Sequence, residues 1–401
     1  MNREEHEFVE YLRDECKDLL TDYYDTDYNL LRWAQGYGFH KEDALTELRR
    51  HLRFRKYYDL DNILTNVPDH PILKKYFPIG LVGEAGLGNT LLVIECAGRI
   101  DLMGILKSVH LSDFLIQRFK FQEKMLAAMN EMEKRNGTQC SVVYILDLEG
   151  LKFDPALINI ATGPYRILWA SVYTAYPEWI NTLLIINAPS FMTLIWKAIG
   201  PLLPERTRNK VKICTGNTDW KSQIQKFAHA DNIPKHWGGN LLDKNGDAMC
   251  RDRLNIPFDP IPQDLYWQPS QETPATQDLT CSTIGAGKFA LFTYVVEKSV
   301  DEPVYVVINR FCDRTFGMGI WFSEDDDAIS YDLEEMEELA PDFDYPGMPT
   351  VDYLRLKMPG SGVYKIKWGN EEAWLRSLTV YHRVRFQNEN RENIKFHEVS
   401  I

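Results

Sequence analysis

Residues 142–148 read Val-Val-Tyr-Ile-Leu-Asp-Leu, an apolar run that ends close to a carboxylate. Two shorter apolar runs follow at 183–187 and 211–215, and helical periodicity occupies the stretches near 110–135 and 154–176. Strands that are buried on both faces are apolar almost throughout, and parallel neighbours need a crossover helix between them. The pattern therefore predicts an α/β domain built on a sheet of buried strands.

The pattern changes on both sides of this domain. Residues 79–94 read as a hairpin around a glycine-rich turn, and residues 4–60 show the periodicity of a small helical bundle. Five prolines between Asn255 and Thr280 predict an extended connection. Beyond Cys281, alternating segments predict an antiparallel β-sandwich with strands at 288–297, 304–310, 317–322, 353–358, 362–368 and 378–386. We expect a helical bundle at 1–75, the α/β domain at 76–245, the connection at 246–280, the β-sandwich at 281–386 and a polar tail at 387–401.

The composition is that of an ordinary globular protein, and its charge is unevenly distributed. The 401 residues are 44% hydrophobic and carry a formal net charge of −13, which argues against a nucleic-acid partner. Between Thr315 and Leu354 there are twelve acids and no Lys or Arg. We expect a solvated acidic loop there, which either binds a basic partner or keeps its lobe away from anionic bilayers.

The cysteines and the N-terminus indicate a reducing compartment. The seven cysteines are scattered and lack C-x-x-C spacing, so neither a disulfide framework nor a zinc site is expected. The first fifteen residues are rich in charge where a signal peptide needs an apolar core. We therefore expect a cytoplasmic protein.

Little in the sequence points to catalysis or to a bound ion. The glycine-rich turn at 83–88 lacks the Lys-Ser/Thr ending of a phosphate loop, and residues 243–247 lack the glutamate that closes a calcium loop. Asp147 and Glu149 form a carboxylate pair at a strand end, where caps and ion pairs are more common than acid–base catalysts. We expect no catalytic residue, metal or cofactor, and we do not expect an enzyme.

Two segments are more apolar than surface helices normally are. Residues 179–196 contain no charge, but Asn181, Asn187 and Pro189 interrupt them, which favours a strand, a turn and a helix over a membrane span. Such a helix needs either a core on both sides or a lipid on one. The stretch at 154–176 is similarly apolar, and two such helices flanking one sheet could wall a cavity for a lipid tail.

Five short motifs occur along the first part of the chain: Asn29-Leu-Leu-Arg32-Trp33, Leu146-Asp-Leu-Glu-Gly150, Tyr176-Pro177-Glu178, Ile186-Asn-Ala-Pro189 and Trp237-Gly-Gly239. In their order and spacing they resemble the CRAL-TRIO lipid-transfer family, and in particular its subgroup with a C-terminal GOLD domain. The segments at 316–322 and 359–366 are similar to a GOLD domain, which implies protein contacts in trafficking or signalling. The resemblance covers almost the whole chain.

The resemblance implies a multidomain α/β plus all-β protein, with a helical bundle, an α/β lipid cage on a mixed sheet, and a β-sandwich. It implies a mobile gate helix at about 190–203 that opens at membranes, and a lipid headgroup held by Glu178 and Lys210. The pocket residues it implies are Tyr144, Leu157, Ile160, Ile167, Trp169 and Tyr173. The gate and membrane-contact residues are Phe191, Met192, Leu194, Ile195, Trp196 and Ile199.

Two departures from the family pattern bear on the ligand. Residues 35–38 read Gln-Gly-Tyr-Gly in place of an arginine-containing pattern, and Val142 and Tyr144 replace the Ser-x-Thr pair of phosphatidylcholine carriers. We therefore expect a cytosolic protein that carries a phosphatidylinositol-type lipid or an isoprenoid such as tocopherol or squalene and contacts membranes transiently. The alternative is a lipid-sensing adaptor in signalling or vesicle trafficking that recruits a protein partner through its β-sandwich.

Overall fold

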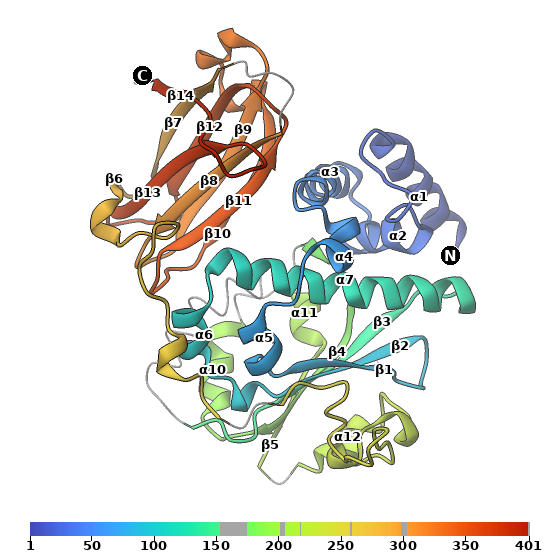
Figure 1. Cartoon of the computed structure of the whole chain (residues 1–401). Coiled ribbons are helices and arrows are strands. Elements are labelled where there is room, and N and C mark those ends of the chain that lie inside the picture. The colour runs from blue at the N-terminus through green and yellow to red at the C-terminus, as the bar shows by residue number, and fades with distance from the viewer. Residues whose placement is uncertain (153–174, 201–204, 217, 257–258, 298–302, 400–401) are drawn as a thin grey trace. The chain divides into compact units, whose positions relative to one another are not determined.

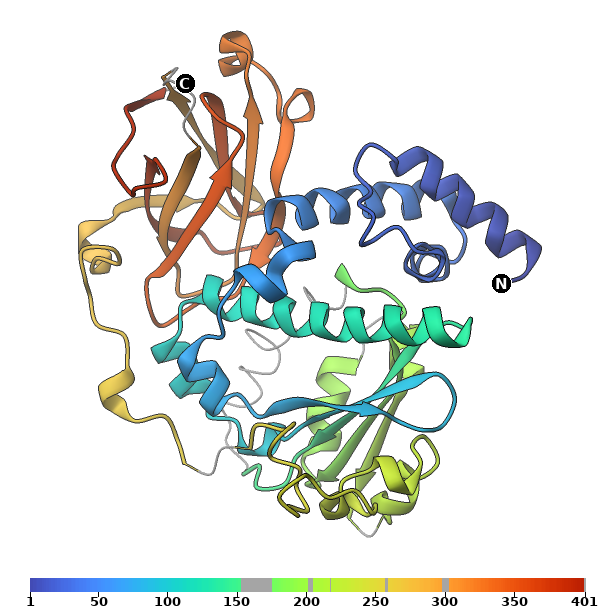
Figure 2. The same cartoon turned by 45° about the vertical axis from the view of Figure 1, so that its right-hand side comes forward.

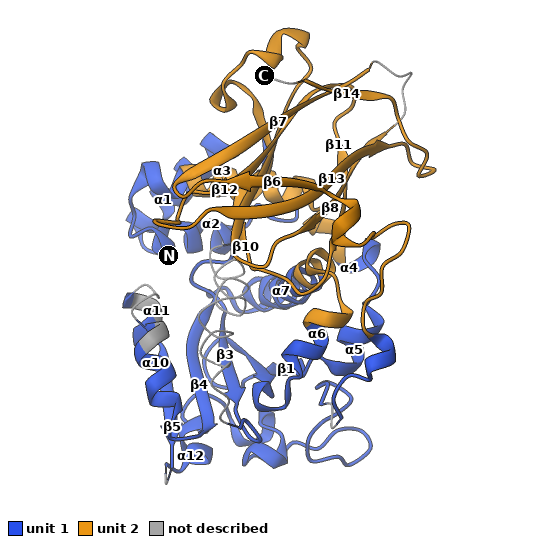
Figure 3. Ribbon diagram, turned by 90° about the vertical axis from the view of Figure 1, so that its left-hand side faces the viewer, with its two compact units in different colours: residues 1–45, 64–105, 117–265 blue, residues 46–63, 106–116, 266–401 orange. Residues whose placement is uncertain are grey.

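The computed structural model describes residues 1–152, 175–200, 205–216, 218–256, 259–297 and 303–399. The chain forms two compact units, each assembled from three separate segments (Figure 3). The first comprises residues 1–45, 64–105 and 117–265, and the second comprises residues 46–63, 106–116 and 266–401. Among the described helices, none combines the length and apolarity that crossing a bilayer requires.

The first unit is built on a mixed five-stranded sheet (Figure 1). β1 pairs with β2 antiparallel, and each later pair in the order β2-β3-β4-β5 is parallel. The expected hairpin and the three expected strands are therefore confirmed, but the strand at 211–215 is only partly buried. The strands are β1 (Ile79–Glu84), β2 (Thr90–Glu95), β3 (Ser141–Asp147), β4 (Ile180–Ala188) and β5 (Val211–Thr215).

The two faces of this sheet are packed differently. Alternate side chains such as Val143, Ile145 and Leu184 form a closed core with side chains of α12 (Trp220–Ile224) and of the chain that follows it. Figures 1 and 2 show α12 beside this sheet. The residues between them, such as Ile185, face α10 (Met192–Ile199) in a smaller cluster with several half-buried members. Because successive strand residues point to opposite faces, one face is closed and the other carries α10.

The helices confirm the periodicity of residues 4–60 and of the stretch near 110–135. Asn2 and Glu5 form a capping box at the start of the first helix, and the Thr26 hydroxyl caps the second by accepting from the Asn29 amide at 3.1 Å. Of the helix expected at 154–176, residues 154–174 lie outside the described residues. The remaining helices are α1 (Arg3–Cys16), α2 (Asp27–Gly36), α3 (Lys41–Tyr57), α4 (Ile63–Asn66), α5 (Pro71–Tyr76), α6 (Leu102–Ser108), α7 (Leu111–Asn136) and α11 (Glu205–Asn209).

A buried ion pair attaches α2 to α7. The Arg32 guanidinium bonds the Glu133 carboxylate and also donates to the Cys140 carbonyl at 2.7 Å. Both charged side chains are almost fully buried. Burial raises the pKa of Glu133, and Arg32 opposes that shift. Arg32, from the sequence motif at 29–33, therefore has a structural role: it joins α2 to α7.

The second unit contains an antiparallel β-sandwich. One sheet has the order β10-β9-β12-β7-β14 and the other has the order β11-β8-β13-β6. All six strands expected from the alternating segments are present. The strands are β6 (Thr280–Ile284), β7 (Lys288–Val296), β8 (Val304–Phe311), β9 (Phe316–Ser323), β10 (Glu337–Tyr345), β11 (Asp352–Met358), β12 (Gly362–Asn370), β13 (Leu378–Gln387) and β14 (Phe396–Val399).

Three edge strands, β6, β10 and β14, lie outside the segments where strands are expected. β10 runs through the acidic segment, so the expectation of a solvated loop is wrong for residues 337–345. Its residues Leu339 and Ala340 are buried, and a single neighbour, β9, pairs with it. β14 falls within the range expected to be a polar tail and pairs with β7. An edge strand needs one partner and few apolar residues, so its sequence pattern is weak.

Candidate functional site

A hydrogen-bonded junction closes the carboxyl ends of β3 and β4. Asp147 ends β3 and accepts from the Asn187 side chain at 2.8 Å, from the Trp237 indole at 2.9 Å and from the Glu149 amide at 2.9 Å. Three of the sequence motifs meet at this one carboxylate, which is 3% exposed. Asp147 is therefore a strand-end cap, as its position suggests.

This junction also contains the one group of possible metal ligands found among the described residues. Atoms of Asp147, Glu149 and His236 lie within 4.8 Å of one another. However, both Asp147 oxygens already accept hydrogen bonds, and Glu149 pairs with Arg99 at 2.6 Å. The arrangement is that of a structural network, and we do not infer a metal from it.

The thiol beside this junction is not activated. Burial raises the pKa of Cys96 to about 12, with Asp147 adding to the shift. A thiol with so high a pKa stays protonated near neutral pH and is a poor nucleophile. Cys96 packs among apolar side chains of the closed core, which accounts for its presence.

α10 follows β4 and has two chemically different sides. Met192 and Ile195 are buried against Ile185 and its neighbours, whereas Leu194 is 56% exposed. Phe191 and Trp196 are half-buried, and the side chain of Ile199 lies outside the described residues. Among the described residues, α10 packs on the sheet with one side. The helix presents an exposed leucine, next to the exposed Thr193 and Lys197, on its other side.

The predicted headgroup residues are brought together at the amino ends of two parallel strands. Glu178 precedes β4 and Lys210 precedes β5, and β4 and β5 are neighbours. The Lys210 ammonium lies 2.8 Å from the Glu178 carboxylate, with the two side chains 23% and 17% exposed. Glu178 has a φ of 57°, a left-handed conformation that is uncommon for residues other than glycine. A partly exposed ion pair of this kind can contact a polar or charged group without first being desolvated completely.

Tyr144 points to the α10 side of the sheet, so its hydroxyl lies on that side. It is 3% exposed and donates to the Glu95 carboxylate, which is fully buried. A second buried pair joins the Tyr176 hydroxyl to Glu123 of α7 at 2.7 Å. Sequence reasoning missed both carboxylates. The signal in the sequence that could have found Glu95 is its position at the end of an apolar strand. The expected pocket residues Leu157, Ile160, Ile167, Trp169 and Tyr173 lie outside the described residues.

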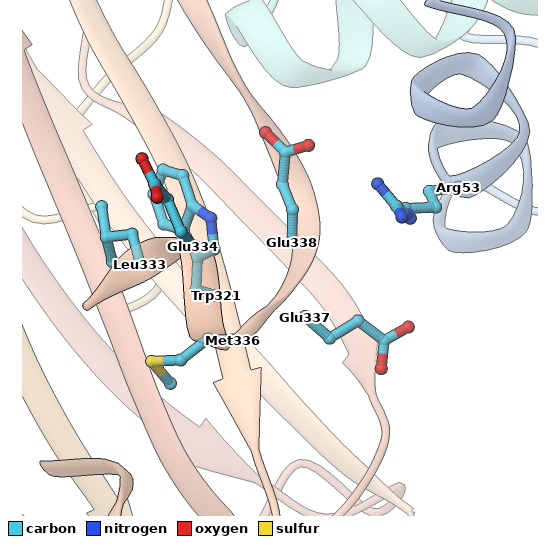
Figure 4. A pocket seen from close by; sticks show the side chains of 7 residues that line it. All are labelled: Arg53, Trp321, Leu333, Glu334, Met336, Glu337 and Glu338. Carbon is cyan, nitrogen blue, oxygen red and sulfur yellow. The ribbon is translucent and has the colours of Figure 1, made fainter. Parts of the chain in front are cut away.

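The second unit has a separate pocket of about 380 Å³ on the acidic edge of its sandwich (Figure 4). Arg53 of α3 lies across from Glu337 and Glu338 of β10. Trp321, Leu333 and Met336 give the pocket an apolar part, and volumes in this range suit a small ligand or one large side chain. The remaining lining residue is Glu334.

The first unit is thus an α/β domain whose mixed sheet is closed on one face and carries an amphipathic helix on the other. Its residues 75–239 match a family model described as the CRAL/TRIO domain. Residues 265–395 match a model described as "F28H7_8_C:-like, C-terminal domain". That description does not name a GOLD domain, so the GOLD assignment stays a prediction.

Comparison with known proteins gives relatives along nearly the whole chain. The CRAL-TRIO domain-containing protein F28H7.8 of Caenorhabditis elegans is 30% identical over 380 residues, covering 92% of this chain and 88% of the relative. Protein ctg-1 of the same organism is 23% identical over 362 residues, covering 90% of this chain and 91% of the relative. The crystal structure of Sfh5 matches with a TM-score of 0.45 and 14% identity, covering 62% of this chain and 90% of that one. The chain belongs to the CRAL-TRIO family, a family of lipid-binding and lipid-transfer proteins.

Proposed function

We propose that this protein binds one hydrophobic lipid between α10 and the sheet and exchanges it with membranes from the cytoplasm. The observation that carries the proposal is the asymmetry of α10. Its buried residues Met192 and Ile195 meet the sheet, while Leu194 faces outward. A helix with that asymmetry can separate from the sheet when its outer side enters a bilayer, because the bilayer replaces the apolar contacts that the helix loses.

The lipid is a phosphatidylinositol-type phospholipid or an isoprenoid such as tocopherol or squalene. Glu178 and Lys210 support a polar head, because a partly exposed ion pair offers both an acceptor for hydroxyls and a cation for a phosphate. The apolar side chains on the α10 side of the sheet support burial of a lipid chain, at roughly 0.8 kcal/mol per methylene.

Ligand identity is tested by extracting the purified protein with organic solvent and analysing the extract by mass spectrometry. We expect near-stoichiometric phosphatidylinositol from the wild type and its loss from Lys210→Ala. A neutral isoprenoid retained by both proteins would give Glu178 and Lys210 a structural role. Lys212→Ala is the matched control, because Lys212 lies two residues away and stacks on Phe227.

The exchange step is tested by Leu194→Asp, which places a charge on the outer side of α10. We expect lipid transfer between vesicles to slow by about tenfold or more, because a carboxylate opposes entry of the helix into the bilayer. Leu242→Asp is the control, since Leu242 is also a partly exposed leucine, at 43%, in the same unit. Equal transfer by the two variants would contradict a role for α10 in exchange.

The pocket on the β-sandwich favours a second candidate, a lipid-sensing adaptor that recruits a basic protein partner. Glu334, Glu337 and Glu338 line this pocket beside apolar side chains, a combination that suits a lysine or arginine side chain. Changing all three to Gln is expected to abolish capture of such a partner while lipid transfer continues. Loss of transfer in the same variant would argue against this candidate.

A further inference from the structure

The loop between β12 and β13 exposes two large apolar side chains at its tip. Trp374 and Leu375 are each 93% exposed, whereas the next most exposed large apolar side chains among the described residues are Leu194 at 56% and Phe289 at 51%. Exposed apolar residues are normal when scattered singly, but adjacent, almost fully exposed Trp and Leu are not. The packing of the β-sandwich does not explain why Trp374 and Leu375 are exposed, so we look for a binding partner that would cover them.

The base of this loop is braced. The side-chain amide of Asn370 donates to the carbonyls of Ile284 at 3.2 Å, Gly285 at 3.1 Å and Arg376 at 2.9 Å. The Asn370 carbonyl accepts from the Gly287 amide at 3.0 Å. These bonds tie the loop at 371–377 to the neighbouring turn at 285–288. The two side chains are therefore presented by an ordered support.

Two further exposed apolar side chains lie on the first residues of β7. Phe289 and Leu291 lie two residues apart on one face of the strand, and both are exposed. Their partners in the register are Gly369 and Lys367 of β12. Among the described residues, β14 pairs with β7 between Thr293 and Val296, beyond Phe289 and Leu291.

The register of the sheet separates this tip from residues 324–338 of the acidic segment, whereas β10 brings Asp342 and Asp344 back to the tip's end of the sheet, where Asp344 pairs with Gly317. Ser323 pairs with Val363 at one end of β12, and Gly317 pairs with Gly369 at the other. Residues 324–338, which carry nine acids and no Lys or Arg, follow the Ser323 end, whereas the loop at 371–377 follows the Gly369 end. A nine-residue strand spans about 30 Å. That distance exceeds the screening length of about 8 Å at physiological salt, so those acids do not repel an anionic surface from the tip.

Both signs of charge occur at the tip itself. Lys367 pairs with Asp342 and with Glu371, each at 2.6 Å. Lys288 and Arg376 are exposed, and neither forms an ion pair with another described residue, while Glu372 is the loop's other acid. Two cations therefore border the apolar pair, where they can meet phosphate groups without competing strongly with a local partner.

We propose that the loop at 371–377 is a membrane-contact site, with Trp374 and Leu375 entering the interfacial layer of a lipid bilayer. A stable protein interface buries about 1,200–2,000 Å² with matched shape, which two side chains on a protruding tip cannot supply. A bilayer needs no matched surface, and tryptophan is enriched at its interface because the ring is apolar and the N–H is polar. The proposal goes beyond lipid exchange and does not depend on α10.

The test measures binding of the full-length protein to vesicles of phosphatidylcholine, with and without phosphatidylserine, by co-sedimentation. We expect the Trp374→Ser, Leu375→Ser double variant to bind about tenfold more weakly or worse, because both apolar side chains are lost. Leu242→Ser is the control and is expected to bind like the wild type. The lipid that co-purifies with each protein is measured in parallel and is expected to be unchanged, which separates this site from the proposed lipid cage.

A second variant keeps the test decisive if the double variant folds poorly. Trp374→Phe retains an apolar ring and is expected to bind vesicles, but to lose the share of fluorescence quenching by brominated phosphatidylcholine that comes from Trp374. Equal quenching in Trp374→Phe and the wild type would overturn the proposal. Equal vesicle binding by the well-folded double variant would also overturn it, as would a wild type that self-associates through this loop and ignores vesicles.

Discussion

At the scale of single residues, Asp147 holds together segments that are far apart in the sequence. Asp147→Ala leaves the donors of Asn187, Trp237 and the Glu149 amide without their acceptor in a largely buried site. We expect the free energy of unfolding in urea to fall by about 3 kcal/mol or more. Glu149→Ala removes a surface ion pair with Arg99 and is expected to cost less than about 1 kcal/mol. Similar losses in the two variants would contradict the structural role given to Asp147.

A second residue-scale prediction concerns pH. Burial lowers the pKa of His382 from 6.5 to about 4, and its ring nitrogen lies 2.9 Å from the Ser282 hydroxyl. Between those two values the unfolded chain binds a proton that the folded chain does not, so stability is full above pH 6.5 and falls as the pH drops toward 4. The free energy of unfolding that protonation of His382 removes is about 3 kcal/mol. Urea unfolding at several pH values should show a shallower decline for His382→Gln, and an identical decline would refute the assignment.

At the scale of elements, α10 is attached to the sheet by few side chains. Ile195→Ala removes buried apolar atoms that contact the cluster around Ile185, so we expect local opening of the helix to become easier by about 2 kcal/mol. Hydrogen exchange of the α10 amides measures that opening directly. Leu194→Ala is the neighbouring control and is expected to change exchange by less than about 0.5 kcal/mol, because Leu194 is exposed. Faster exchange in the control alone would show that the sides of α10 are assigned the wrong way round.

At the scale of the whole molecule, the second unit is closed by a buried ion pair that involves the start of α7. Asp352 lies 2.9 Å from Arg310 and accepts from both the amide and the hydroxyl of Ser112. Burial raises the pKa of Asp352, but Arg310 and Ser112 together hold it below its usual range. The β-sandwich therefore depends on a segment that precedes it by more than 150 residues in the sequence.

We expect Asp352→Ala to lower the free energy of unfolding by about 3–5 kcal/mol, because Arg310 would remain buried without its partner. Asp313→Ala removes an exposed carboxylate near Arg314 and should cost less than about 1 kcal/mol. Thermal unfolding compares the two variants with the wild type. A small effect at Asp352 would mean that the sandwich is stable without this pair.

Local patterns in the sequence determined most of the secondary structure. The apolar runs at 142–148, 183–187 and 211–215 became parallel strands, and the alternating segments beyond Cys281 became six strands of the sandwich. Periodicity depends only on residues that are close in the sequence, so it can be recognised before the fold is known. The same is true of the caps at Asn2 and Thr26.

The tertiary structure alone decided which distant residues meet. The spacing of Glu178 and Lys210 does not place them together; the parallel pairing of β4 and β5 does. The burial of Glu95 and the strand β10 within an acidic segment likewise depend on a neighbouring strand or ring that a local pattern does not contain. The physical reason is that backbone conformation follows from short-range sterics and periodicity, whereas burial and pairing depend on the path of the whole chain.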